Sequence, residues 1–285
     1  MNYEISLVTT MAISVMFALS LNLITGFCGQ ISLGHAAFLG IGAYTGALLG
    51  KAGMPFLATL PVAMLLAGAV GAIVGLASLR VRTDFLAITT MGVGFLFVGI
   101  VRQQDALGGE LGVSSFPDHG FGKLGFMVLA LFTAALVLTL CVYIRRAWMG
   151  RVFKGIAEDE DTMRVLGIDV PQYKLVAFAL GTALAGLSGV FYAYHLQFIG
   201  PDSFGFVESV TVLSMVVFGG IGSVVGVSLS AALLSALPAW FQFIGDYKLL
   251  VYGGLLFVMM RFSPGGMAGL VKRFFDPTQR RGGRI

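Results

Sequence analysis

The most constraining feature of this sequence is a series of apolar blocks of about 20 residues that recurs along its length. A helix of about 20 residues is just long enough to cross the hydrocarbon core of a bilayer. Only 11% of the residues are charged, against about 25% in soluble domains. Because so few charges cannot cover a water-facing surface, the sequence predicts an integral membrane protein.

Nine apolar segments can be read along the chain, with ends defined to within a few residues. They cover about residues 5–25, 34–50, 55–79, 85–103, 123–144, 172–195, 208–220, 224–243 and 247–262. The predicted fold is therefore an all-α, polytopic transmembrane bundle of about 8–10 membrane segments, forming a single domain over residues 1–285. The first segment follows no basic stretch, so we interpret it as a retained span rather than a signal peptide.

The seventh segment is short for a full crossing and ends in a glycine-rich break. The residues at the break are Gly219, Gly220, Gly222 and Ser223. Glycine readily leaves the helical conformation, and irregular backbone at membrane depth is tolerated only inside protein or beside a water-filled cavity. The break predicts a short broken or re-entrant helix pair that lines a transport pathway. An ordinary tight turn at the membrane face is an equal alternative.

Small residues recur at every fourth position of the segment at about 172–195. They are Gly181, Ala185 and Gly189. A face of small side chains lets membrane helices approach closely, so these positions are expected to contact a neighbouring helix, within the chain or on a second subunit.

The basic residues divide unevenly between the two sides that alternating spans create. Four of the 18 fall on one side, at Lys51, Arg102, Lys123 and Lys248. The other fourteen fall opposite, at Arg80, Arg82, Arg145, Arg146, Arg151, Lys154, Arg164, Lys174, Arg261, Lys272, Arg273, Arg280, Arg281 and Arg284. Because cytoplasmic loops are enriched in lysine and arginine, the sequence predicts a cytoplasmic loop at about 145–171 and a basic cytoplasmic tail at about 263–285. The N-terminus is then outside and the C-terminus cytoplasmic.

Several chemistries are disfavoured by what the sequence lacks. The span interiors carry essentially no Asp, Glu, Lys or Arg, which counts against an ion-coupled secondary carrier. The chain has no G-x-x-x-x-G-K-[ST] phosphate loop, no metal-type spacing around Cys28 and Cys141, and no recognisable catalytic set. We therefore expect a transport subunit rather than an enzyme, with no cofactor or metal bound by this chain and no nucleic-acid partner.

The long polar stretch after the fifth segment has the pattern of a short helix outside the membrane. Its acidic residues, Glu158, Asp159, Glu160 and Asp161, lie near the expected N-terminal end, where the helix dipole favours negative charge. Apolar surface comes from Ile156, Met163, Val165 and Leu166, and Gly167 and Pro171 mark the end. An amphipathic helix of this kind can dock in a groove on another protein, although a solvated loop that links two spans has a similar composition.

Three stretches of this sequence, Ser20 to Tyr44, Glu158 to Phe178 and Pro201 to Gly226, resemble the branched-chain amino-acid permease family (LivM type) of ABC importers. The segment from Glu158 to Phe178 resembles its cytoplasmic coupling loop, in which Asp161 to Gly167 corresponds to the Glu-Ala-Ala-x-x-x-Gly motif. The segment from Ser20 to Tyr44 resembles its N-terminal signature, and Pro201 to Gly226 resembles its late segment. The chain departs from the family at 107–112, which lacks a Thr-Gly-Gly-x-x-Gly turn, and at Pro238-Ala239, where a Pro-Glu pair is usual.

The resemblance implies an importer permease for branched-chain amino acids in a bacterial inner membrane; urea, short amides and aromatic carboxylates are alternative cargoes. It implies a heterodimer with a second permease, two ATPase subunits that use ATP and Mg, an external solute-binding protein and a lipid bilayer. The residues expected to couple to the ATPase are Glu158, Asp159, Glu160, Asp161, Met163, Arg164, Leu166 and Gly167. The N-terminal signature adds Gln30, Ser32, His35 and Tyr44 to the pathway or gating candidates; for His35 a structural hydrogen bond is the alternative.

Overall fold

The computed structural model describes residues 2–78, 83–114, 116–240, 250–254, 257, 265–267 and 269. Three sequence predictions fall outside these residues, wholly or for the most part. They concern the basic pair Arg80 and Arg82, the last apolar segment at about 247–262, and the basic tail at about 263–285.

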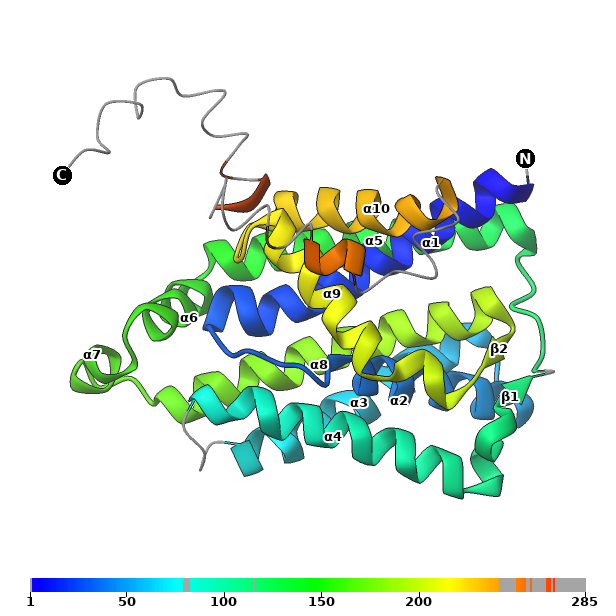
Figure 1. Cartoon of the computed structure of the whole chain (residues 1–285), viewed down its shortest axis with the longest axis horizontal. Coiled ribbons are helices and arrows are strands. Elements are labelled where there is room, and N and C mark those ends of the chain that lie inside the picture. Colours follow the sequence, from blue (N-terminus) through cyan, green and yellow to red (C-terminus); the bar gives the residue numbers. More distant parts are fainter. Residues whose placement is uncertain are drawn as a thin grey trace.

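The described chain is an all-α membrane bundle, as the sequence predicts (Figure 1). Six of its helical stretches are long and apolar enough to cross a membrane. The membrane helices are α1 (Asn2–Leu21) with its π-helical continuation η1 (Asn22–Phe27), α2 (His35–Lys51), α3 (Phe56–Ser78), α4 (Thr83–Gln103), α5 (Gly122–Arg146), α8 (Val170–Leu196), α9 (Phe206–Gly219) and α10 (Val224–Trp240). Two short helices, α6 (Trp148–Glu158) and α7 (Glu160–Val165), lie between α5 and α8.

Short elements form the end of the bundle that lies opposite α6 and α7. They are the 3-10 turns Asp105–Leu107, Gly109–Leu111 and Pro201–Phe204 and the strands β1 (Val113–Ser114) and β2 (Phe198–Ile199). The two strands pair antiparallel, with Val113 opposite Ile199. Helices α6 and α7 project from one end of the bundle and the β1–β2 pair closes the other (Figure 1).

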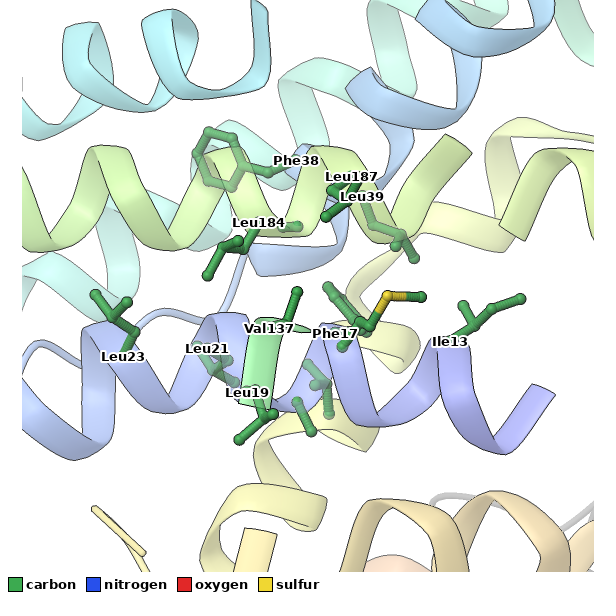
Figure 2. Packing of buried hydrophobic residues seen from close by; sticks show 14 of the residues in the cluster. Ile13, Phe17, Leu19, Leu21, Leu23, Phe38, Leu39, Val137, Leu184 and Leu187 are labelled. Atoms are coloured by element: carbon green, nitrogen blue, oxygen red, sulfur yellow. The ribbon is translucent and has the colours of Figure 1, made fainter. Parts of the chain in front are cut away.

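Helix α8 packs in the middle of the bundle against α1, α2 and α3. Its small residues make this possible: a Cβ at Gly181 would meet Ile24 and the carbonyl of Ser20, and one at Gly189 would meet the backbone of Leu39 and Ala43. The predicted close contacts of this face are confirmed, and they lie within the chain. Around them Phe17, Phe38, Leu39, Leu184 and Leu187 fill the space between α1, α2 and α8 (Figure 2).

After η1 the chain turns back into the bundle, which the sequence did not predict. Residues 29–34 are not helical, and α2 begins at His35, whose Nε2 lies 2.8 Å from Ser20 Oγ on α1. Ser20 precedes the end of η1 by roughly 10 Å of helix. The first turn of α2 is therefore inside the bundle, beside the C-terminal end of α1, and α2 is a partial span.

Helices α9 and α10 meet at the glycine-rich break that the sequence predicts. Their turn has positive φ at Gly220 (101°) and Gly222 (80°), a conformation that glycine adopts without strain. The Gly222 amide donates to Asn22 Oδ1 at 2.9 Å, and α10 then returns along α1 until Tyr3 Oη donates to the Ala239 carbonyl at 2.8 Å. The turn thus packs against the end of α1–η1, which favours a tight turn near the membrane face over a break at mid-membrane.

Candidate functional site

Helix α6 lies against the bundle through one apolar face. Val152, Phe153 and Ile156 are buried, and the Phe153 ring meets that of Tyr173 on α8 edge-on at 6.3 Å. The sequence pattern places Ile156 on the apolar surface of one short docking helix, together with Met163, Val165 and Leu166. That expectation is wrong, because two helices occupy the stretch and Ile156 belongs to the buried face of the first. Glu158 is the last residue of α6, and its carboxylate lies 3.5 Å from Lys154 Nζ.

Helix α7 is short and capped at both ends. The Asp159 carboxylate accepts hydrogen bonds from the amides of Asp161 (3.0 Å) and Thr162 (3.2 Å), as an N-cap residue does. At the other end Gly167 has φ +81°, its amide donates to the Arg164 carbonyl, and Ile168 donates to the Met163 carbonyl. This is a Schellman motif, so Gly167 ends the helix as predicted.

The N-cap of α7 is expected to depend on pH. Hydrogen bonds from Thr162 and Asp161 hold the pKa of Asp159 below its ordinary value of 3.8. Because the folded pKa is the lower one, the cap is at full strength above about pH 4 and weakens as pH falls through the folded pKa. The protection of the Asp161 and Thr162 amides, measured as the ratio of the intrinsic to the observed hydrogen-exchange rate at each pH, should therefore fall at low pH. In Asp159→Asn, which keeps a cap oxygen without a titratable group, this loss of protection should be absent; an identical pH response in the variant would contradict the assignment.

Ion pairs and packing fix α7 to its neighbours and leave its tip free. Glu160 pairs with Lys174 on α8, whereas the pair between Arg164 and Asp161, at 3.1 Å, lies within α7. Met163 packs against Gly155 of α6, where a Cβ would meet its side chain. Val165 and Leu166 are 88% and 69% exposed. The predicted coupling residues Met163 and Leu166 therefore differ. Leu166 is exposed, as is its neighbour Val165, whereas Met163 is half-buried against α6.

Three of the N-terminal pathway candidates, Gln30, Ser32 and His35, are buried polar residues at or just before the start of α2. Because the Ser20 hydroxyl donates to the Phe17 carbonyl at 2.6 Å, the neighbouring His35 Nε2 is assigned as the donor to Ser20. The His35 ring also stacks on Phe17 with centroids 5.3 Å apart. Gln30 Nε2 donates to the Lys174 carbonyl at 3.0 Å. The structural hydrogen bond weighed for His35 is thus present.

Four buried side-chain atoms lack a hydrogen-bond partner within the described residues: Asn22 Nδ2, Ser32 Oγ, His35 Nδ1 and Tyr44 Oη. Most buried polar groups in folded proteins are satisfied, so such exceptions call for an explanation. Three of them lie between residues 22 and 35, where the chain turns back into the bundle, and Tyr44 lies farther along α2. This concentration makes the region a candidate for hydrogen bonds that form in another conformation of the protein.

The pathway candidates do not gather into one cluster. Tyr44 lies roughly 13 Å along α2 from His35 and packs edge-on against Phe97 and Phe204. Gly219, Gly220, Gly222 and Ser223 lie instead beside η1, toward the end that carries α6 and α7. Ser223 Oγ accepts the Gly226 amide at 3.1 Å, which caps the start of α10.

The comparison with known proteins decides the family. The model of the branched-chain amino acid transport system permease component matches residues 4–260. This chain belongs to that permease family. The permease is 34% identical over 299 aligned residues to the high-affinity branched-chain amino acid transport system permease protein LivM of Escherichia coli K12, covering 94% of the chain and 70% of the relative. LivM of Salmonella typhimurium is 33% identical, with 94% and 71% covered.

A second type of relative matches half of the permease. The protein LivH of Escherichia coli K12 is 29% identical over 144 residues, which is 50% of this chain and 46% of the relative. No solved structure matches the permease significantly. The family predicted from the three sequence stretches is therefore confirmed by the match over almost the whole chain.

The structure adds site residues that the sequence analysis did not identify. The amide of Ala36, in the first turn of α2, donates to Ser209 Oγ at 3.1 Å, and the Leu33 amide donates to Thr90 Oγ1 at 3.0 Å. Ser209 lies within the late stretch that carries the family resemblance, so it could have been noted. Thr90 gives no signal, since a lone threonine in an apolar span looks like any other.

A cavity of about 200 Å³ lies between α1, α2, α8, α9 and α10 of the permease. Polar groups on its lining include Thr10, Tyr192, His195 and Glu208, beside apolar walls from Phe17 and Leu39. Thr10 Oγ1 lies 3.1 Å from His195 Nε2. Such a mixture of walls suits a small solute with polar and apolar parts. No three metal-ligating side chains are grouped anywhere in the described ranges.

Proposed function

We propose that this permease is the membrane subunit of an ATP-driven ABC importer that moves branched-chain amino acids into a bacterial cell. The observation that carries the proposal is the family match over residues 4–260, together with the branched-chain amino acid transport for which the LivM relatives are named. ATP and Mg are used by two separate ATPase subunits. The cargo is delivered by an external solute-binding protein, and a second permease completes the translocation unit, as a heterodimer; the similarity to LivH supports two permease types.

The ATPase subunits act on α7. Its exposed Val165 and Leu166 offer apolar surface for a groove on a partner, and its caps make it a rigid element. Displacement of α7 reaches the membrane helices by a short route. Glu160 of α7 pairs with Lys174, and the Lys174 carbonyl accepts the Gln30 side chain next to the start of α2. A push on α7 therefore biases the region that holds the unpaired buried polar groups.

The charge distribution supports the orientation with α6 and α7 in the cytoplasm. Six described basic residues lie at the α6–α7 end: Arg145, Arg146, Arg151, Lys154, Arg164 and Lys174. Lys51, Arg102 and Lys123 lie at the opposite end, where Arg102 pairs with Asp202 at 2.6 Å. By the positive-inside rule the N-terminus is outside and the C-terminus cytoplasmic, in a bacterial inner membrane.

Uptake by the assembled transporter tests the cargo. Proteoliposomes containing this chain, its second permease and the ATPase subunits would be given the binding protein and radiolabelled leucine, isoleucine or valine. ATP-dependent uptake of these three, with urea, short amides and aromatic carboxylates left outside, is the expected result. Uptake of one of those other solutes in preference to leucine would reassign the cargo and leave the importer mechanism standing.

A further inference from the structure

A basic cavity of about 460 Å³ opens at the α6 end of the bundle. It lies between the end of η1, the junction of α5 with α6, and the turn that joins α9 to α10, and Gly265 and Gly269 also line it. Its charged side chains are Arg145, Arg151 and Lys154, and its lining includes no acidic residue within the described part of the chain. Most of the other lining residues are glycines, so the backbone is accessible and few side chains occupy the cavity.

The positive charge of this basic cavity is largely unneutralised. Arg145 and Arg151 have no ion-pair partner among the described residues, and Arg151 donates only to the Arg146 carbonyl at 3.2 Å. Lys154 pairs with Glu158 at 3.5 Å, but both side chains are mostly exposed, so the pair neutralises the field weakly. Guanidinium groups bind phosphate oxygens in a fixed bidentate geometry, so two arginines and a lysine suit a phosphate group.

An exposed apolar ridge leads away from the basic cavity. It begins at Ile221 on the cavity wall and continues at Val225 and Leu229 of α10, which are 58%, 62% and 57% exposed. Trp148 is 62% exposed at the same end, and the Arg151 guanidinium lies 5.7 Å from its ring centre. Exposed tryptophan marks the interface between headgroups and hydrocarbon. A free phosphate would use only the cavity, whereas a phospholipid would occupy both cavity and ridge.

We propose that the basic cavity binds the headgroup phosphate of an anionic phospholipid, whose acyl chain lies along the Ile221–Val225–Leu229 ridge of α10. Anionic lipids gather in the cytoplasmic leaflet, and basic pockets between helices on that side bind their headgroups. The bound lipid bridges the α5–α6 junction to the α9–α10 turn, so it ties the base of the coupling helices to the broken helix pair. This site is separate from the cargo and does not depend on its identity.

Native mass spectrometry of the full-length permease tests the proposal. The protein would be purified in neutral detergent, delipidated, and titrated with phosphatidylglycerol or phosphatidylcholine of the same chain length. Wild-type protein should bind one phosphatidylglycerol in preference to phosphatidylcholine. Each basic residue near an anionic surface contributes about 5-fold, so Arg145→Gln/Arg151→Gln should weaken phosphatidylglycerol binding about 25-fold. Arg145→Lys/Arg151→Lys, which keeps the charge, should recover most of the affinity.

The matched control is Lys51→Gln/Lys123→Gln, which removes the same charge from the opposite end. It should leave the affinity for phosphatidylglycerol within about 2-fold of wild type, since screened charges that far away contribute little. An equal loss in both variants, or no loss in either, would overturn the site. Displacement of phosphatidylglycerol by equimolar inorganic phosphate or glycerol phosphate would assign the cavity to a soluble anion and overturn the lipid.

Discussion

Replacing Val165 with aspartate should lower ATP-driven uptake at least about 30-fold while leaving the membrane bundle folded. Val165 is 88% exposed at the tip of α7, so the free chain tolerates a charge there. In the proposed complex the same side chain is buried against an ATPase subunit. Burying an unpaired carboxylate costs at least about 2 kcal/mol, which is about 30-fold in the affinity of the partner. Co-purification of the ATPase subunits and uptake in proteoliposomes should fall together.

Leu111→Asp is the matched control for this variant. Leu111 is 89% exposed, almost the same as Val165, but it lies in a turn beside β1 at the opposite end of the bundle. The ATPase subunits should remain bound to Leu111→Asp as tightly as to wild type. If Val165→Asp retained its ATPase subunits and its uptake, α7 could not be the docking helix.

Gly42→Ala should destabilise the permease by about 3 kcal/mol, at the upper end for overpacking. Gly42 of α2 faces Gly186 of α8, and a Cβ there would overlap the Gly186 backbone. Backbone cannot rotate away as a side chain can, so two central helices must separate. For a chain of this size the apparent melting temperature should fall by roughly 10 °C, which a thermal unfolding assay in detergent measures.

Gly99→Ala tests whether this loss comes from the close approach. Gly99 is also helical, on α4, but a Cβ there meets no heavy atom within 4 Å. Alanine is the better helix former, so the variant should match or slightly exceed the wild-type melting temperature. Equal losses at Gly42 and Gly99 would show that α2 and α8 do not pack backbone to backbone.

The parts of the fold that the sequence predicts are those with a local signal. The apolar blocks gave the long spans, and the spacing of Gly181, Ala185 and Gly189 marked the packed face of α8. Gly167 ends α7 because a positive φ is required there, and the glycines at 219–222 break the last described helix pair. Each of these features follows from residues near one another in the chain.

The return of residues 29–34 into the bundle left no local signal. The start of α2 is held by Ser20, Thr90 and Ser209, which come from three other helices and look ordinary in sequence. The division of the coupling stretch into α6 and α7 was missed for a similar reason. Asp159 was noted as one of four acidic residues, and only its contacts with Asp161 and Thr162 show that it begins a second helix.

The most direct test of the proposed mechanism is to determine which energy source drives solute accumulation. Solute accumulation would be measured in liposomes containing the purified permease alone under an imposed ion gradient, and in liposomes containing it with its second permease, ATPase subunits and binding protein under ATP. Accumulation only in the second preparation, and only with hydrolysable ATP, is expected. Concentration of leucine by the permease alone, using an ion gradient, would contradict the proposal.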